Sequence, residues 1–326
     1  MNRKDQSLAA LVAVIWGFNF VVIDWGMGDV PPLLFLAARF LAVVVPAVFL
    51  LDPPPVPWRT VAAVGVFMSL GQFGFLYVAM DAGMPPGLAG LVLQAQVVLT
   101  ILLATVVLRE RPTGPQTIGV VLGAAGLVVV GLGRGGHVPV IALALCLMGA
   151  LMWAIGNVVS RASGATGGLA LTVWSALVVP IPLIALSMVL DGPGVLADGV
   201  AAFGWKAAVS TVYTAGLASL VGYGIFNGLL SRNTSASVVP WIMLVPPVAI
   251  GSAWLLLSEV PSTGELVGGA ILVVGVLVAQ RNYRIRRDPA RGAANTVGEP
   301  NLSDPTRCTP DLPLPGTPVQ PAPAVP

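Results

Sequence analysis

Residues 84–131 read MPPGLAGLVLQAQVVLTILLATVVLRERPTGPQTIGVVLGAAGLVVVG. This stretch joins two long apolar runs through a charged corner at residues 109–112, and the second run is rich in glycine. A shift of 149 positions superimposes it on residues 233–280, NTSASVVPWIMLVPPVAIGSAWLLLSEVPSTGELVGGAILVVGVLVAQ, so that Glu110 aligns with Glu259. A polar corner that occurs twice between membrane-length runs predicts two copies of one membrane module.

The residues after each corner predict the start of a helix. Thr113 with Gln116, and Ser262 with Glu265, have the spacing of a capping box, in which each residue satisfies a free backbone amide of the first turn. The corner glutamates follow a helix C-terminus, where the helix dipole disfavours an anion. For Glu110 we therefore expect capping of the next helix or pairing with Arg111, in preference to a coupling role.

The composition is that of a membrane protein. Hydrophobic residues make up 56% of the chain and charged residues 9%, against about 25% charged in soluble domains, and the mean hydropathy is +0.90. A net charge of +2 gives no indication of nucleic-acid binding. Two cysteines and one histidine exclude a disulfide framework and a histidine-based metal or catalytic centre. We expect no cofactor and no metal, and surrounding lipid as the main environment.

The chain contains ten apolar runs long enough to cross a bilayer, which requires about 20 residues of helix. We therefore predict an all-α integral membrane protein with ten transmembrane helices, built as two five-helix repeats at residues 1–135 and 136–287. The predicted spans are 8–27, 31–51, 58–80, 86–108, 113–131, 138–160, 168–190, 206–230, 235–257 and 263–280.

An odd number of spans per repeat inverts the second copy relative to the first. If successive loops are assigned alternately to the two sides of the membrane, the basic residues are unevenly divided. One side has eleven of them and the other has only Arg134 and Lys206. Cytoplasmic loops carry the excess of basic residues, so both termini are predicted in the cytoplasm, with Glu110 inside and Glu259 outside. The eleven are Arg3, Lys4, Arg59, Arg109, Arg111, Arg161, Arg232, Arg281, Arg284, Arg286 and Arg287.

Residues 288–326 differ in character from the rest of the chain. Ten of these 39 residues are proline, and the apolar spacing disappears. Such a segment has too little apolar surface to offset its chain entropy, which predicts a disordered cytoplasmic tail. A binding site for a proline-recognising partner is the alternative.

Five short motifs resemble the EamA group of the drug/metabolite transporter superfamily, and their sequences are similar to those of bacterial exporters of cysteine and O-acetylserine. They are WGFNFVV at 16–22, PPLLFLAARF at 31–40, GMPPGLAGLVLQAQ at 83–96, VWSAL at 173–177 and VGYGI at 221–225. The resemblance implies an inverted-repeat carrier in the bacterial inner membrane that exports small metabolites by alternating access. It also implies a central cavity enclosed by the first four helices of each half, with the fifth and tenth helices packed behind. Where related exporters often carry lysine, this chain has Asp24.

Polar residues inside the spans are the candidates for a substrate cavity, because a polar side chain in hydrocarbon needs a partner or water. Trp16 and Asn19 lie within about 60° of each other on the first helix. Trp153 and Asn157 share a face on the sixth helix, which is the repeat-related one. An indole beside an amide on both helices could bind an amino-acid-like ligand. Hydrogen bonding between helices, with the tryptophans simply packing, is the equal alternative.

Two more pairs share helix faces, Tyr223 with Asn227 on the eighth helix and Gln72 with the region of Tyr77 on the third. We include them in the cavity, with core packing as the alternative.

Gln94 and Gln96 would point about 200° apart on a continuous helix. One of them is therefore expected to face the cavity and the other a neighbouring helix. The equivalent region of the second copy holds Trp241 and the prolines at 240, 246 and 247. Proline there could expose backbone carbonyls to the substrate.

Arg39 lies about 12 Å deep in the second span. An unpaired arginine at that depth costs a few kcal/mol, and Asp24 is the nearest counter-ion by depth. We hypothesise that Arg39 and Asp24 form an ion pair whose protonation couples proton entry to substrate exit. The alternative is that Arg39 extends towards the interface and Asp24 is merely interfacial.

These observations predict a secondary exporter of small polar metabolites, such as cysteine or O-acetylserine, driven by proton exchange. A broad-specificity efflux carrier for drug-like or toxic compounds is the alternative within transport. From other classes, a non-transporting membrane scaffold stays open, whereas an intramembrane enzyme would need clustered acids, histidines or a nucleophile with its base. The sequence leaves a homodimer open.

Overall fold

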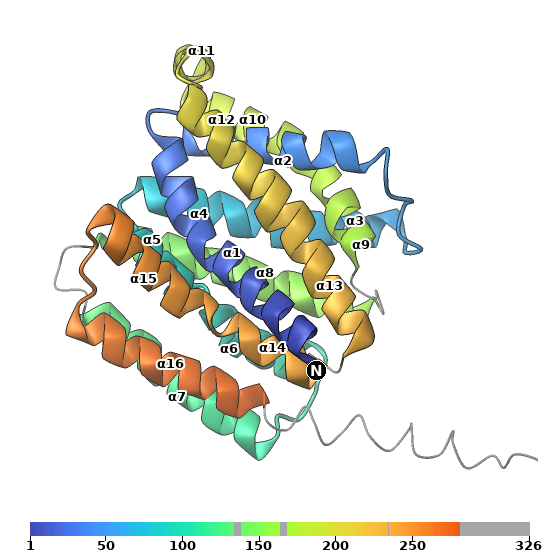
Figure 1. Ribbon diagram of the computed structural model, residues 1–326, viewed down its shortest axis with the longest axis vertical. Helices are drawn as coiled ribbons and strands as arrows, with labels where there is room; N and C mark the ends of the chain where they lie inside the picture. The colour runs from blue at the N-terminus through green and yellow to red at the C-terminus, as the bar shows by residue number, and fades with distance from the viewer. Residues whose placement is uncertain (134–137, 164–167, 234, 281–326) are drawn as a thin grey trace, which may run out of the picture. The chain divides into compact units, whose positions relative to one another are not determined.

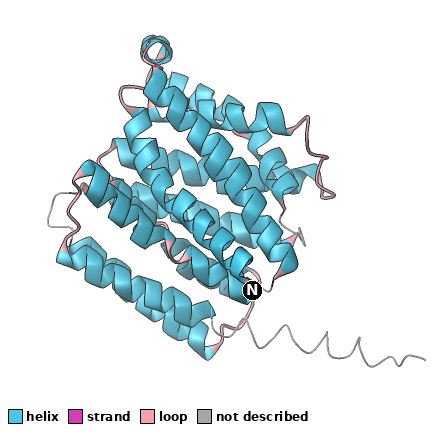
Figure 2. Cartoon of the chain, in the orientation of Figure 1, coloured by secondary structure: helices cyan, strands magenta, loops and turns pink. Residues whose placement is uncertain are grey.

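The computed structural model describes residues 1–133, 138–163, 168–233 and 235–280. All regular secondary structure in these ranges is helical (Figure 2). The predicted proline-rich tail at 288–326 lies outside the described residues.

The first half runs through seven helices and one π-helical segment. Their bounds are α1 Arg3–Met27, α2 Pro32–Ala47, α3 Trp58–Val64, η1 Gly65–Gly71, α4 Gln72–Asp81, α5 Pro86–Val92, α6 Ala95–Val107 and α7 Gly114–Gly133. The second half has the bounds α8 Val140–Ala162, α9 Leu169–Ser175, η2 Ala176–Val178, α10 Pro180–Leu190, α11 Pro193–Ala201, α12 Trp205–Val212, η3 Tyr213–Val221, α13 Gly222–Arg232, α14 Ser235–Ile242, α15 Val245–Leu257 and α16 Thr263–Gln280.

Nine helical stretches in the described ranges are long and apolar enough to cross a membrane, and α2 is a shorter apolar helix of 16 residues. Together they confirm the ten predicted segments and the all-α membrane class. The second segment is shorter than its predicted range of 31–51. Pro46 lies inside its last turn, where it removes one helical hydrogen bond, and the helix ends at Ala47.

Helix α11 lies between the predicted spans 168–190 and 206–230, where the sequence analysis predicts no helix. Pro193 occupies the first helical turn, a position where its missing N–H costs nothing. Gly199 faces Pro31 and Leu34 at the start of α2. Figure 1 shows α11 end-on beside one end of the bundle, so it lies across the direction of the spanning helices.

Helix contacts repeat when the two halves are exchanged. Helix α1 of the first half packs against α12, η3 and α13 of the second half. In the same way, α8 of the second half packs against α3, η1 and α4 of the first half. Helix α1 also packs on α15, and α8 packs on α6. Three further pairs, α2 with α10, α5 with α15 and α7 with α16, join equivalent or symmetry-related helices (Figure 1). The exchange brings the first four segments of each half together around one centre.

The pairing of α7 with α16 depends on small residues. A Cβ on Gly126 would lie 2.6 Å from the backbone oxygen of Gly268, and one on Gly268 would lie 2.7 Å from the oxygen of Gly126. Glycine lets the two backbones touch, as in other closely packed membrane helices. The two helices lie side by side at the edge of the bundle, where the fifth and tenth helices were expected (Figure 1).

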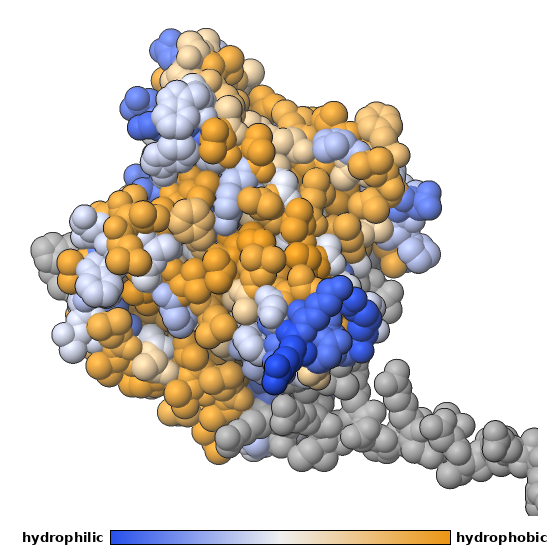
Figure 3. Space-filling view, in the orientation of Figure 1, coloured by the Kyte–Doolittle hydropathy of each residue, from blue (hydrophilic) through white to orange (hydrophobic). Residues whose placement is uncertain are grey.

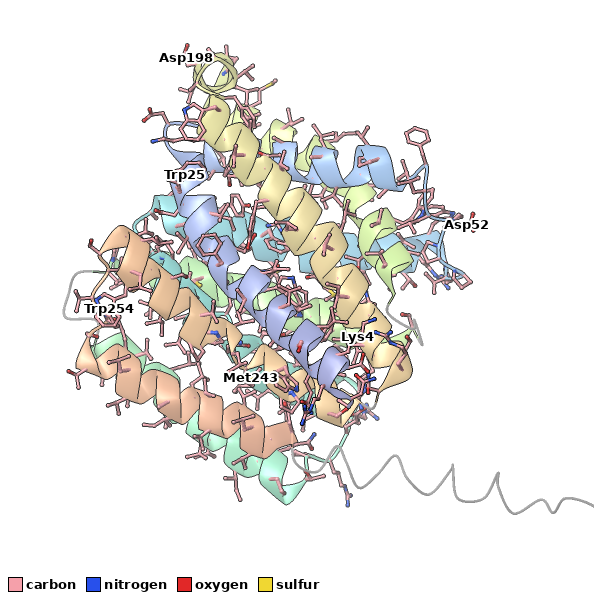
Figure 4. All side chains as sticks on the ribbon, in the orientation of Figure 1. Lys4, Trp25, Asp52, Asp198, Met243 and Trp254 are labelled. Atoms are coloured by element: carbon pink, nitrogen blue, oxygen red, sulfur yellow. The ribbon has the colours of Figure 1, made fainter. Side chains whose placement is uncertain are left out.

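Apolar side chains cover most of the face drawn in Figure 3. The most exposed of the large apolar residues include Leu132, Ile181 and Leu255, each about 80% accessible. Charged residues gather at the ends of the bundle, and Figure 4 shows Lys4 at one end and Asp198 at the other. A surface of this kind suits hydrocarbon surroundings and leaves polar groups at the two interfaces.

Candidate functional site

A cavity of about 140 Å³ lies between the two halves. Its walls come from α1, α2, α4 and α8, from the segments around the α5–α6 and α14–α15 junctions, and from η3 and α13. Eight of the polar or aromatic residues selected from the sequence line it: Trp16, Asn19, Arg39, Gln72, Gln94, Gln96, Trp153 and Tyr223.

Both halves break a helix at equivalent positions beside this cavity. Helix α5 gives way to α6 at Leu93–Gln94, and α14 gives way to α15 at Met243–Leu244. Figure 4 labels Met243 at the second break. At each break the amides bond three residues back instead of four, as Gln96 N does with Leu93 O at 3.1 Å and Met243 N with Pro240 O at 3.2 Å. The interruption expected from the prolines of the second copy therefore occurs in both.

The first break corrects the expectation for Gln94 and Gln96. The angle of 200° holds only for a continuous helix, and here the helix restarts at Ala95. Both glutamines consequently line the cavity. Gln94 is buried, and the Oε1 atom of Gln96 accepts a hydrogen bond from Asn157 Nδ2 at 3.3 Å.

Two π-helical segments, η1 and η3, occupy equivalent places in the third and eighth spans. Gln72 directly follows η1, and Tyr223 follows η3 by two residues, so the wider turns set which residues face the cavity. Such segments are frequent at functional sites. The hydrophobic pattern does not predict them. The repeated Ser-Leu pair at 69–70 and 219–220 is the signal that marks both.

Aromatic rings line opposite walls of the cavity. The Trp16 ring lies 5.0 Å from Tyr223, and its Nε1 donates to the Ala218 carbonyl at 2.9 Å. On the other side Phe73 lies 6.5 Å from Trp153. The Trp16 indole approaches so closely that a Cβ on Gly222 would lie 2.5 Å from its Nε1. Trp16 is thus fixed in place by backbone contacts from the other half.

The predicted ion pair between Arg39 and Asp24 is wrong. Arg39 Nη1 donates to the Tyr77 hydroxyl at 3.3 Å, Nη2 donates to Ser219 Oγ at 3.2 Å, and the guanidinium lies 4.3 Å from the centre of the Phe73 ring. Within the described ranges the ion pairs are Glu110–Arg161 and Asp5–Arg232. Arg39 points into the bundle, whereas Asp24 lies three residues from the end of α1, so equal depth did not bring them together.

The remaining candidates lie outside the cavity lining. Tyr77 is fully buried and supports Arg39 from behind. Asn157 bonds to Gln96 and to Thr100 Oγ1 at 3.3 Å, in a layer behind the wall. Trp241 packs on the small apolar cluster of Ala9, Leu229 and Val238. Asn227 is one turn beyond Tyr223, and its Nδ2 is buried without a partner among the described residues.

A second cavity of about 60 Å³ adjoins the first and shares Arg39, Phe73, Trp153 and Tyr223 with it. Ser69, Ser175 and Ser219 add hydroxyl groups to this smaller space. Arg39 therefore stands at the boundary between an amide-lined and a hydroxyl-lined compartment.

A third cavity, of about 210 Å³, surrounds the corner glutamate of the second half. Glu259 Oε2 accepts a hydrogen bond from Gly87 N at 3.4 Å, and Ser262 and Glu265 lie in the same wall. Burial raises the pKa of Glu259 above its ordinary value, the Gly87 bond lowers the pKa, and the charges of Asp24 and Glu265 raise it. In the first half Glu110 instead pairs with Arg161 at 2.9 Å, which replaces the expected Arg111.

Metal-ligating side chains do not cluster at these cavities. Throughout the described part of the chain, histidine, cysteine, aspartate and glutamate form no group of three or more that could hold a metal ion.

Comparison with known proteins agrees with this architecture. The model of the EamA-like transporter family matches the sequence twice, at residues 6–132 and 140–280. A probable amino-acid metabolite efflux pump of Escherichia coli (strain K12) is 37% identical over 293 residues, which cover 88% of this chain and 98% of the pump. A probable terminal-alkyne amino-acid exporter of Streptantibioticus cattleyicolor is 30% identical over 64% of this chain and 69% of its own length.

One crystal structure has the same fold, with a TM-score of 0.58 at 20% identity. The match covers 87% of this chain and 99% of that one.

Proposed function

This chain belongs to the EamA-like transporter family, and we propose that it exports small amino-acid-like metabolites across the bacterial inner membrane by alternating access. The observation that carries the proposal is the cavity between the halves, where amides, an arginine and indoles converge. The name of the Escherichia coli relative, an amino-acid metabolite efflux pump, gives the substrate class. Both ends of the chain face the cytoplasm in this proposal, because the loops on that side carry the excess of arginine and lysine.

The size of the site favours small substrates over drug-like ones. Pockets for drug-sized ligands measure about 300–1,000 Å³, whereas the two adjoining cavities measure about 140 and 60 Å³. Efflux of drug-like compounds is therefore the second candidate, supported by the aromatic walls alone.

We also propose proton coupling at Glu259, in place of the Arg39–Asp24 pair. The carboxylate is partly buried beside other acids, and the causes that act on it raise its pKa on balance. Protonation removes the repulsion of Glu259 with Asp24 and Glu265, so proton uptake at this corner makes the close approach of these acids less unfavourable. The corner faces the cell exterior in the proposed topology, as proton-driven export requires.

Counterflow in proteoliposomes tests the proposed function. Vesicles holding the full chain are loaded with unlabelled serine, cysteine or O-acetylserine, or with a drug-like cation, and uptake of the labelled compound is followed. Saturable exchange is expected for the amino-acid compounds. Exchange of the cation alone would favour drug efflux, and exchange of none would favour a scaffold.

Two glutamine variants provide a matched pair for this assay. Gln72→Leu removes an amide from the cavity wall at similar volume and is expected to reduce exchange about tenfold or more, the value of a hydrogen bond to a charged group. Gln6→Leu changes an exposed glutamine on α1 and should leave exchange unchanged. Equal rates in both variants would contradict the placement of the site in this cavity.

A further inference from the structure

Arg39 is a buried cation in the middle of α2. Its accessible fraction is 3%, although it lies between Pro32 and Ala47 in a spanning segment. Both hydroxyls that it contacts accept its hydrogen bonds, and Ser219 Oγ is held in place because it donates its own proton to Thr214 O at 2.8 Å. Its Nε has no hydrogen-bond partner among the described residues. The guanidinium is thus oriented by neutral groups and keeps an unused donor.

The charge of Arg39 is not neutralised by the described part of the chain. Both ion pairs found there lie elsewhere, and among the described residues Arg39 is the only charged one that lines the main cavity. Arginine stays protonated at all physiological pH values, and a buried charge without a partner is strongly unfavourable. Hydroxyls and a ring face offset only part of that cost. An anion inside the cavity would offset the rest, and a carboxylate matches the planar guanidinium in shape.

The same cavity carries unused acceptors. The Oδ1 atom of Asn19 and the Oε1 atom of Gln72 are buried without a hydrogen-bond partner in the described structure. Their residues are 7% and 2% accessible, and both line the cavity that Arg39 lines. An ammonium group has three donors and no acceptor, so it suits two amide oxygens. The indole and phenol rings of Trp16 and Tyr223 add faces that attract a cation.

We propose that the cavity binds the zwitterion of an α-amino acid, with the carboxylate on Arg39 and the ammonium on the amide oxygens of Asn19 and Gln72. This assignment rests on the proposed export function and specifies which groups of the substrate are recognised. The site has one positive charge, which matches one carboxylate. A phosphate dianion would need a second basic side chain, which the lining lacks. The side chain of the substrate is left to the aromatic walls, so the site selects the backbone of the amino acid.

The test compares ligands that differ at one end. Wild-type protein is reconstituted, and thermal stabilisation and counterflow are measured with serine, its methyl ester and ethanolamine, which lacks the carboxylate. Lactate, which lacks the ammonium, completes the set. Serine is expected to bind at least tenfold more tightly than each of the other three. Equal binding of serine and its methyl ester would overturn the assignment without any mutation.

The arginine itself is tested by Arg39→Gln and Arg39→Lys. Arg39→Gln is expected to lower serine affinity to the level of ethanolamine while ethanolamine binds as before, and Arg39→Lys should restore part of the difference. Arg59→Gln removes an exposed arginine at the start of α3 and is the matched control. If Arg39→Gln does not fold, the wild-type comparison of serine with its ester decides.

The two proposals fail in different ways. Stabilisation by serine but not by its ester, with no counterflow of any amino acid, would overturn the export function and leave the site standing. Counterflow in which serine, ester and Arg39→Gln all behave alike would overturn the site and leave the function standing. Absence of both stabilisation and counterflow would overturn both.

Discussion

The two corners that follow α6 and α15 have the same backbone and opposite surroundings. Arg109 and Ser258 both adopt the left-handed conformation, with φ of 53° and 60°. The next amide then bonds six residues back, from Glu110 N to Ala104 O and from Glu259 N to Ala253 O, at 3.4 Å in each case. A repeated sequence has therefore produced a repeated turn.

The side chains of these corners meet different partners. Glu110 pairs with Arg161, and both side chains are about half exposed. Glu259 is partly buried against Gly87, and the acidic Asp24 acts on it. Asp24 follows Trp16 by eight residues and Arg161 follows Trp153 by eight, so the two are equivalent in the repeat. The repeat thus preserves the turn but not its partner. Aspartate stands at position 24 where the other half has Arg161, so Glu259 faces an acid where Glu110 has a cation.

The largest effect is expected from Glu259→Gln. We propose that Glu259 exchanges the coupling proton, so this variant should lose export driven by a pH gradient while counterflow, which needs no net proton movement, continues. Glu110→Gln is the matched control and should keep both activities. Uphill export that survives in Glu259→Gln would show that the acidic corner is not the coupling site.

The pH dependence of wild-type export should follow the same group. The pKa of Glu259 is raised above its ordinary value of 4.5. The carboxyl therefore keeps its proton at pH values somewhat above 4.5 and loses it as the pH rises through the higher pKa of the folded protein. The protonated form therefore persists into a higher pH range than an exposed glutamate would allow.

A second substitution would make the two corners alike. Asp24→Lys places a cation where the first half has Arg161, and it should pair with Glu259 and lower the pKa of that carboxyl. The pH profile of export should then shift to lower pH. Asp24→Asn removes the charge without adding one and should produce a smaller shift in the same direction. An unchanged profile in both variants would mean that Asp24 does not act on the coupling group.

The smallest effect is expected at the other corner. Arg161→Gln breaks an ion pair whose side chains are about half exposed, and such pairs contribute about 0–1 kcal/mol. Thermal unfolding in detergent should shift by a few degrees at most, and high salt should reduce the difference. A large loss of stability would show that the Glu110–Arg161 ion pair contributes much more to the free energy of unfolding than an exposed pair is expected to.

The periodic patterns predicted the parts of this molecule that local chemistry controls. The repeated corners and the capping pairs that follow them were predicted from spacing, because each depends on residues within about one or two turns. The structure has Ser262 N bonded to Glu265 Oε2 at 2.8 Å and Thr113 N to Gln116 Oε1 at 2.9 Å. Eight residues chosen as polar or aromatic groups inside spans line one cavity.

The failures all required knowledge of which helix stands beside which. Gln94 and Gln96 both line the cavity because α5 ends before Gln94 and α6 starts at Ala95, and a period of 3.6 residues per turn does not predict that break. Arg39 was paired by depth with Asp24, yet it bonds to Tyr77 and Ser219 from the third and eighth spans.

By itself, the sequence determined that this chain is a membrane protein of two related halves, because hydrophobic length and repeat spacing are properties of the chain alone. Only the tertiary structure decided which polar groups are satisfied and which are left facing the cavity. The physical reason is that the free energy of a buried charge or amide depends on the groups within hydrogen-bonding distance. For Arg39 these groups are Tyr77 of the same half and Ser219 of the opposite half, which are far from it in the sequence.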